Sequence, residues 1–420
     1  MNNEKVKKVI ESVQDLFSKP ATEELNNSQI PTFITIDCKE NPEKSFKLFD
    51  KDADSFGELL NSLMNEICDE KLSKEMLKNI VSDLYFLNGL NVTSLKKKLC
   101  DLKEKQYLMF ERIYGIELVN KKVLKLGDNV FVKKENISDY IREKCDTNLS
   151  DNKKTLELLF SSNSSNDFSC VYFVFLCDAY DKDAALLIYS KAYSNVFALL
   201  KFIVGYPGKR SYIGKSFFSP FAKHTFCLSN GIIYKNFELN VKDKPIVLDS
   251  GSFIDPLMGF DKIWNFYNSA SQNDIQKRIS VAIKWVSRFF DEESDIHKCI
   301  DLCCALESLH QEKEGPFRPG IVSSLSEFVA YITNDNADSR MECERTIKDM
   351  YNFRSKGVHS GHDNESIVEI DNYLVITYAT IAFILTNKPF CDCSSAKEIN
   401  ELIARFKYSY SLDNLENNEK

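Results

Sequence analysis

The sequence has no two cysteines separated by two residues, the spacing typical of zinc sites and redox motifs. Its 13 cysteines are an odd number, scattered over 420 residues. A disulfide framework needs an even, regularly spaced set. We therefore expect reduced cysteines, with Cys299, Cys303 and Cys304 acting as small core residues in apolar helix turns.

Long apolar segments are also missing. The first residues, Met1–Lys8, are polar and charged and lack the apolar core of a signal peptide. The longest uncharged apolar stretch, Tyr373–Thr386, is too short to span a bilayer. We expect a soluble, cytoplasmic protein that does not associate with membranes.

Basic residues are in deficit. Lys and Arg number 54 against 62 Asp and Glu, which gives a net charge of -8. A broad basic surface, the usual basis of nucleic-acid affinity, is excluded, so any RNA site must be local. Hydrophobic residues make up 43% and charged residues 28% of the chain, a globular composition with length for about two or three domains.

Residues 1–110 are predicted as an α+β region. Two short apolar runs, Phe33–Ile36 and Ser45–Phe49, flank a turn rich in Asn and Pro and predict a hairpin. Helical spacing of apolar residues predicts helices over Phe56–Cys68, Lys74–Leu87 and Thr93–Lys105.

Residues 111–265 are predicted as a β-rich middle region. A helix is expected over Ala184–Phe202, and Asn230-Gly231 between two apolar runs indicates a hairpin turn. The predicted strands are Ile116–Val119, Val130–Val132 and Val171–Leu176.

Residues 271–410 contain five helical segments with apolar stripes and short connections, so they can close one core. Lys262–Asn273 is interpreted as the linker into this bundle, with Ser271 as the first N-cap, and Ser411–Lys420 as a frayed polar tail. The chain is expected to be an α+β multidomain protein, with a mixed α/β-rich N-terminal region followed by an all-α C-terminal bundle.

Four acidic residues near the start of the fifth predicted helix are the best candidates for metal ligands. They are Asp363, Glu365, Glu369 and Asp371. Negative side chains stabilise a helix N-terminus, and Ser366 with Glu369 makes a capping pattern, so these positions are explained without a metal. We expect neither a catalytic metal nor a cofactor.

The run from Tyr351 to His359 carries the strongest chemical signal. Arg354 lies on an apolar helical stripe with Met350, and an uncompensated buried charge costs several kcal/mol. The arginine therefore requires a carboxylate or an anionic ligand. Glu307, on the inward face of an upstream helix, is the candidate partner.

Arg354 and His359 are five residues apart, about 140° around an ideal helix, so they converge only if the helix ends or distorts between them. Gly357 permits this, because glycine adopts the left-handed conformation that ends helices. A phosphate-binding arginine beside a proton-moving histidine indicates a metal-independent ribonuclease. A buried structural ion pair between Arg354 and Glu307 is the alternative.

The order Ala305–Leu309 followed by Tyr351–His359, with Ile279–Trp285 as a first helix, resembles the ApeA-like branch of the HEPN ribonucleases over residues 272–388. The catalytic residues implied by this resemblance are Arg354, His359, Ser355 and Glu307, and the candidate substrate-binding residues are Lys356 and Tyr351. The family often has glycines directly after the histidine. Here Ser360-Gly361-His362 follows, which makes His362 a second candidate.

The resemblance implies an endoribonuclease that leaves a 2′,3′-cyclic phosphate and acts in antiphage defence by abortive infection. RNA, with tRNA as one candidate, would be the substrate, and the N-terminal region would sense a phage-derived trigger. A homodimer through the helical domain is expected, because each chain has one well-placed histidine whereas the reaction needs a base and an acid. The alternatives are a non-catalytic HEPN module that binds nucleotide or protein, and the toxin of a toxin–antitoxin pair.

Overall fold

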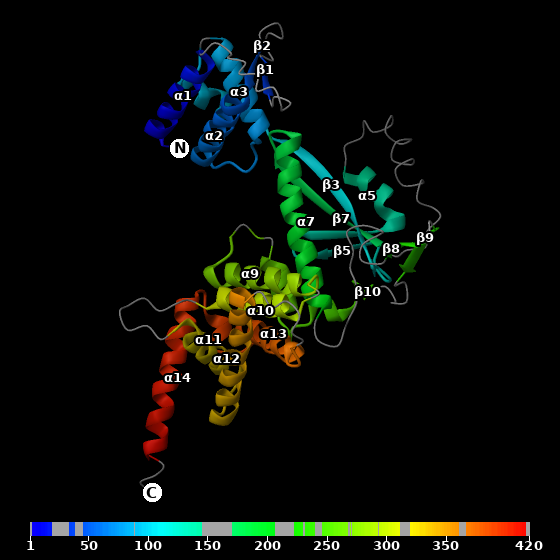
Figure 1. Ribbon diagram of the computed structural model, residues 1–420, viewed down its shortest axis with the longest axis vertical. Coiled ribbons are helices and arrows are strands. Elements are labelled where there is room, and N and C mark those ends of the chain that lie inside the picture. The colour runs from blue at the N-terminus through cyan, green and yellow to red at the C-terminus, as the bar shows by residue number, and fades with distance from the viewer. Residues whose placement is uncertain are drawn as a thin grey trace. The chain divides into compact units, whose positions relative to one another are not determined.

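The computed structural model describes residues 2–18, 33–37, 45–87, 89–144, 170–205, 222–229, 232–239, 246–267, 269, 271–292, 294–310, 320–360 and 367–416. It is a mixed α+β protein with many helices in its C-terminal part, as predicted (Figure 1). The chain forms two compact units, Met1–Met109 with Phe175–Lys191, and Phe110–Val174 with Ala192–Lys420. The predicted middle and helical regions thus lie mostly in one unit.

The first unit packs helices around a two-stranded sheet. Strands β1 (Phe33–Asp37) and β2 (Ser45–Phe49) pair antiparallel, which confirms the predicted strands of the hairpin. Its turn lies outside the described residues. The helices that lie wholly within this unit are α1 (Asn3–Ser18), which was not predicted, α2 (Asp50–Ile67), α3 (Lys74–Phe86) and α4 (Val92–Cys100). Their apolar faces bury Val6, Phe56, Leu63, Leu77 and Leu95 completely.

A four-stranded sheet has the order β3-β7-β6-β5. Its strands are β3 (Lys105–Tyr114), β5 (Val123–Leu126), β6 (Asn129–Lys133) and β7 (Cys170–Ala179). The helix predicted over Thr93–Lys105 is wrong at its end, because α4 stops at Cys100 and Lys105 begins a strand. The segment from Lys105 forms a strand because it pairs with β7, which is distant in the sequence, and local apolar spacing does not reveal such pairing.

Gly127 makes the turn between β5 and β6. Its φ is +58°, and a Cβ at this position would lie 2.0 Å from the carbonyl oxygen of Trp264. Glycine is therefore required both for the backbone conformation and for the close approach.

Shorter pairs and helices complete the middle of the chain. Strand β4 (Ile116–Glu117) pairs parallel with β10 (Ile246–Val247). Strands β8 (Ala222–Ser229) and β9 (Ile232–Leu239) pair antiparallel on either side of Asn230-Gly231, whose own structure is not described. The helices are α5 (Ile137–Lys144) and α7 (Lys182–Val204), which covers the predicted helix Ala184–Phe202.

Helix α7 is the one described helix that is long and apolar enough to cross a bilayer by length and composition alone. Of its most apolar 18-residue window, 56% is buried within the structure. Core helices meet the same criterion, so this is weak evidence for a membrane span.

The five predicted C-terminal helices are present, and Figure 1 shows them gathered together. They are α9 (Asp274–Phe289), α10 (Asp295–Leu309), α11 (Ile321–Thr333), α12 (Ala337–Ser360) and α13 (Ile370–Thr386). Helix α10 packs against α9, α12 and α13, and its side chains Cys299, Leu302 and Leu306 are fully buried. The apolar stripes therefore meet in one core, as their spacing predicts.

Three boundaries differ from the prediction. The linker predicted over Lys262–Asn273 begins inside α8 (Phe260–Phe266), a helix held by its buried apolar residues. Asn273, and not Ser271, caps α9 in a reciprocal capping box with Gln276. The tail predicted to fray from Ser411 continues as helix α14 (Ala396–Glu416).

The predicted capping pattern of the fifth helix is also changed. Helix α13 begins at Ile370 with Glu369 as its N-cap and Asp371 in its first turn. Ser366, Asp363 and Glu365 lie outside the described residues.

Candidate active site on helices α10 and α12

Packing of α12 against α10 positions the candidate site. The Cys299 thiol on α10 donates to the backbone oxygen of Met350 on α12, with 3.1 Å between the two atoms. Ile347 and Met350 are completely buried at this contact. The apolar stripe of the motif helix therefore faces the core, and Arg354 follows Met350 one turn later on the same side.

Arg354 and Glu307 meet across these helices, as predicted from their stripes. Nη2 of Arg354 lies 3.6 Å from Oε1 of Glu307, and their side chains are 31% and 24% exposed. Both groups retain partial contact with solvent, so the pair is not fully buried, and a structural ion pair remains the alternative to a ligand-binding arginine. The exposed part of the guanidinium is accessible to an anionic ligand.

Tyr351 completes this cluster. Its hydroxyl donates a hydrogen bond to Oε1 of Glu307, and the guanidinium carbon of Arg354 lies 4.9 Å from its ring centroid. Burial raises the pKa of Tyr351, and the neighbouring Glu307 raises it further. The phenol thus stays protonated and orients Glu307, whereas the sequence assigned it to the substrate.

Nε of Arg354 is buried without a hydrogen-bond partner among the described residues. Among the described residues the guanidinium contacts one carboxylate and one ring, and its buried Nε is out of reach of a ligand, so an anion can bind only at the exposed part of the group. A phosphate oxygen forms strong charge-assisted bonds with such a group.

The structure does not support a helix end at Gly357. Helix α12 continues through this residue to Ser360, and Gly357 does not have a positive φ. A Cβ on Gly357 would lie 2.1 Å from Cγ2 of Ile296 on α10. Glycine is needed here for close helix packing, and the backbone of His359 stays about 140° around the helix from Arg354.

The other predicted site residues have no described contact with the cluster of Arg354, Glu307 and Tyr351. Ser355 and Lys356 are exposed on α12, and the Lys356 ammonium lies 5.5 Å from the ring centroid of Phe353. The side chain of His359 and all of His362 lie outside the described part of the chain. The structure thus brings together Arg354, Glu307 and Tyr351 of the predicted set.

Cys304 shows that the charged cluster is larger than the sequence analysis predicted. Burial raises the pKa of its thiol, Glu307 and Asp301 contribute in the same direction, and Arg354 and Arg288 oppose them. Asp301 and Arg288 were not predicted as site residues. The signal that could have identified Arg288 is its position three residues after Trp285, which repeats the spacing of Arg354 after Tyr351.

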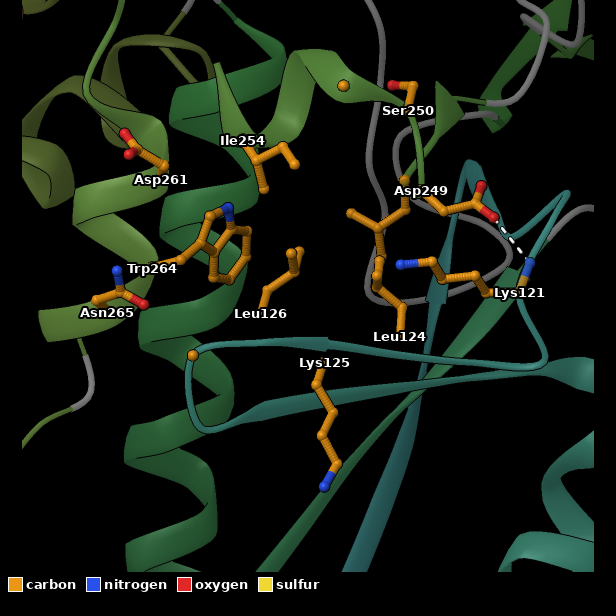
Figure 2. A pocket seen from close by; sticks show the side chains of 13 residues that line it. Lys121, Leu124, Lys125, Leu126, Asp249, Ser250, Ile254, Asp261, Trp264 and Asn265 are labelled. Atoms are coloured by element: carbon orange, nitrogen blue, oxygen red, sulfur yellow. Dashed lines mark hydrogen bonds between the residues drawn. The ribbon is translucent and has the colours of Figure 1, made fainter. Parts of the chain in front are cut away.

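Outside this site, a cavity of about 360 Å³ lies beside β5 and α8 (Figure 2). Two of its polar groups are engaged by the protein, whereas Oδ1 of Asp261 is buried without a hydrogen-bond partner among the described residues. Asp249 accepts from the backbone N–H groups of residues 119–121, and the Trp264 indole donates to the Phe253 carbonyl at 2.7 Å. Burial opposes ionisation of Asp249, but the three N–H donors lower its pKa. Lys125 points away from the other labelled side chains in Figure 2.

Among the residues that the structure describes, no three His, Cys, Asp or Glu side chains are grouped to hold a metal ion. Comparison with known proteins gives no match among the family models, the curated proteins or the solved structures. The resemblance to the HEPN ribonucleases therefore rests on the residues of this chain alone.

Proposed function

We propose that this protein is a metal-independent endoribonuclease of the HEPN class. The observation that carries the proposal is the partly exposed Arg354, held in place by Glu307 and Tyr351 on two packed helices. Such a guanidinium can bind the scissile phosphate and stabilise the negative charge that develops on it. Ser355 and Lys356 are exposed on the following turn, where they can contact substrate.

The proposed reaction is an internal transfer. The ribose 2′-oxygen loses its proton to a base and attacks the adjacent phosphorus, the bond to the 5′-oxygen breaks, and an acid protonates the leaving oxygen. The products are a 2′,3′-cyclic phosphate and a 5′-hydroxyl end. His359 is the proposed proton-transfer residue, because imidazole titrates near neutral pH.

The continuous helix favours a composite site in a homodimer. Within one chain, the backbone of His359 lies on a different side of α12 from Arg354. Two chains that meet along this helix can bring Arg354 of one chain and the partner's His359 to the same phosphate. Two arginines at one cleft also concentrate positive charge in an acidic protein.

The cellular role follows from the same resemblance. We place the activity in cytoplasmic antiphage defence, with RNA such as tRNA as the substrate and the N-terminal region as the sensor of a phage-derived trigger. A non-catalytic HEPN module is the second candidate, because the helix does not bend at Gly357 to join His359 to Arg354.

A cleavage assay with the purified protein tests this proposal. End-labelled single-stranded RNA and DNA of the same sequence are incubated with it in excess EDTA, and the products are identified by mass spectrometry. The proposal expects cleaved RNA with cyclic phosphate ends and intact DNA. Binding of RNA without cleavage supports the non-catalytic module, and restoration of cleavage only by a divalent cation indicates another mechanism.

A further inference from the structure

The arrangement around Arg354 has a counterpart on α9. The Arg288 guanidinium carbon lies 4.6 Å from the ring centroid of Trp285, three residues earlier on the same helix. Nη2 of Arg288 lies 3.5 Å from Oδ1 of Asp301 on α10. Helices α9 and α12 therefore each present to α10 an arginine that lies over an aromatic ring and pairs with a carboxylate.

The two carboxylates lie on different faces of α10, on either side of Cys304. Asp301 and Glu307 are six residues apart, a rise of about 9 Å along the helix axis and about 120° around an ideal helix. Cys304 lies midway between them along the helix, and both arginines oppose the burial that raises the pKa of its thiol. A stacked nucleic-acid strand rises about 3.4 Å per nucleotide, so two or three nucleotides cover this distance.

Arg288 is more accessible than Arg354. Its side chain is 56% exposed, while that of its partner Asp301 is 2% exposed. The carboxylate therefore holds the guanidinium from the protein side and leaves its outer edge to solvent. A planar guanidinium that lies on an aromatic ring is oriented for bidentate binding of a phosphate.

Two other carboxylates near Asp301 already have basic partners. Asp291 accepts a hydrogen bond from Lys201, and Glu292 lies 3.5 Å from Nδ1 of His297. The Lys201 ammonium reduces the repulsion of a phosphate at Arg288 by Asp291.

We infer that Trp285 and Arg288 form a second phosphate subsite for single-stranded RNA beside Arg354. This inference rests on the proposed ribonuclease function. Arg288 binds a phosphate two or three nucleotides from the scissile one through its exposed edge, and Trp285 fixes the plane of the guanidinium. Two adjacent arginine sites give an acidic chain the local positive charge that RNA binding requires.

The test measures binding separately from cleavage. The probe is a fluorescent 12-nucleotide RNA with 2′-O-methyl groups, which cannot undergo internal transfer, and its affinity for the full-length chain is measured by anisotropy at several salt concentrations. Arg288→Gln is expected to weaken binding about tenfold or more, since a hydrogen bond to a charged group contributes that much. The salt slope should fall by about 0.7, the value for one phosphate contact on a single strand.

Matched variants distinguish a subsite from a general loss of charge. Arg288→Lys keeps the positive charge but loses the paired donors of the planar guanidinium, so we expect an RNA affinity between those of wild type and R288Q. Arg340→Gln is the control: Arg340 lies 4.3 Å from the Tyr331 ring centroid, but its Nε donates to the backbone oxygen of Asn334. This residue is 14 positions before Arg354 on α12, about 21 Å along the helix, and its loss should leave binding unchanged.

Each result decides the inference. If wild type and R288Q bind the RNA with equal affinity, the subsite is overturned. It is also overturned if R340Q weakens RNA binding as much as R288Q does. If RNA is not cut but R288Q selectively weakens binding, the nuclease proposal fails and the subsite stands. If W285A changes the molar mass in light scattering but not RNA affinity, the surface is a protein contact and the inference is wrong.

Discussion

Asp301 is a carboxylate in an unfavourable position. Its side chain is 2% exposed, and its Oδ2 atom has no hydrogen-bond partner among the described residues. Burial raises the pKa of Asp301 from 3.8 to about 6, although Arg288 acts in the opposite direction. The charged form that pairs with Arg288 is therefore maintained at the cost of stability.

The substitution Asp301→Asn should show this cost as a pH dependence. Because the folded pKa is higher than the unfolded one, the native state binds more protons between about pH 4 and pH 6, and stability falls as the pH rises through this range. Urea unfolding should give D301N and wild type similar stability near pH 4. Near pH 8 the variant should be more stable by about 2–3 kcal/mol, and a constant difference at all pH values would contradict this assignment.

Arg354 also contributes to stability, by neutralising Glu307. For a fully buried pair, removal of one partner costs about 3–5 kcal/mol, but the exposure of these two side chains reduces the expected cost of Arg354→Ala to about 1–3 kcal/mol. Glu307→Gln in the same background should recover part of this loss, because no unpaired charge remains. Equal stability of R354A and wild type would show that the pair is solvent-screened.

At the scale of the helices, Gly357 tests how α10 and α12 approach each other. Alanine is favoured over glycine inside an exposed helix by about 1 kcal/mol, yet its Cβ would lie 2.1 Å from Cγ2 of the buried Ile296. We expect Gly357→Ala to destabilise the protein by about 1–3 kcal/mol in urea unfolding, through overpacking.

A double-mutant cycle separates packing from backbone strain. In an Ile296→Ala background the obstructing methyl group is absent, so Gly357→Ala should become neutral or stabilising. A cost that persists in that background would instead indicate the left-handed helix end predicted from the sequence.

The spacing of apolar residues predicted where helices form better than it predicted which side chains meet between them. Helical spacing identified α2, α3, α7 and the bundle helices, because an apolar stripe reports burial directly. It also brought Arg354 to Glu307, since both lie on stripes. It missed Arg288 and Asp301, which meet through the packing of α9 on α10, and it read Gly357 as a helix end because sequence alone does not show Ile296 facing it.

At the scale of the whole molecule, the proposed composite site requires two chains. Arg354→Ala and His359→Ala variants should each be inactive on RNA. A mixture refolded together should recover a small part of the wild-type rate, because a heterodimer contains one intact pairing of Arg354 with the partner's His359 but only one histidine for the two proton transfers. Light scattering measures in parallel whether the active species is a dimer. Inactive mixtures despite heterodimer formation, or full activity in a strictly monomeric species, would contradict the composite site.

The proposed role of His359 is tested by the rate of RNA cleavage by wild type and His359→Ala in excess EDTA, with His297→Ala as the control. His297 is half-exposed on α10, beside Glu292. We expect wild type and H297A to cleave RNA at similar rates in EDTA. The rate of H359A should be at least a hundredfold lower, with an unchanged unfolding transition. Cleavage by H359A at the wild-type rate would show that His359 is not the proton-transfer residue.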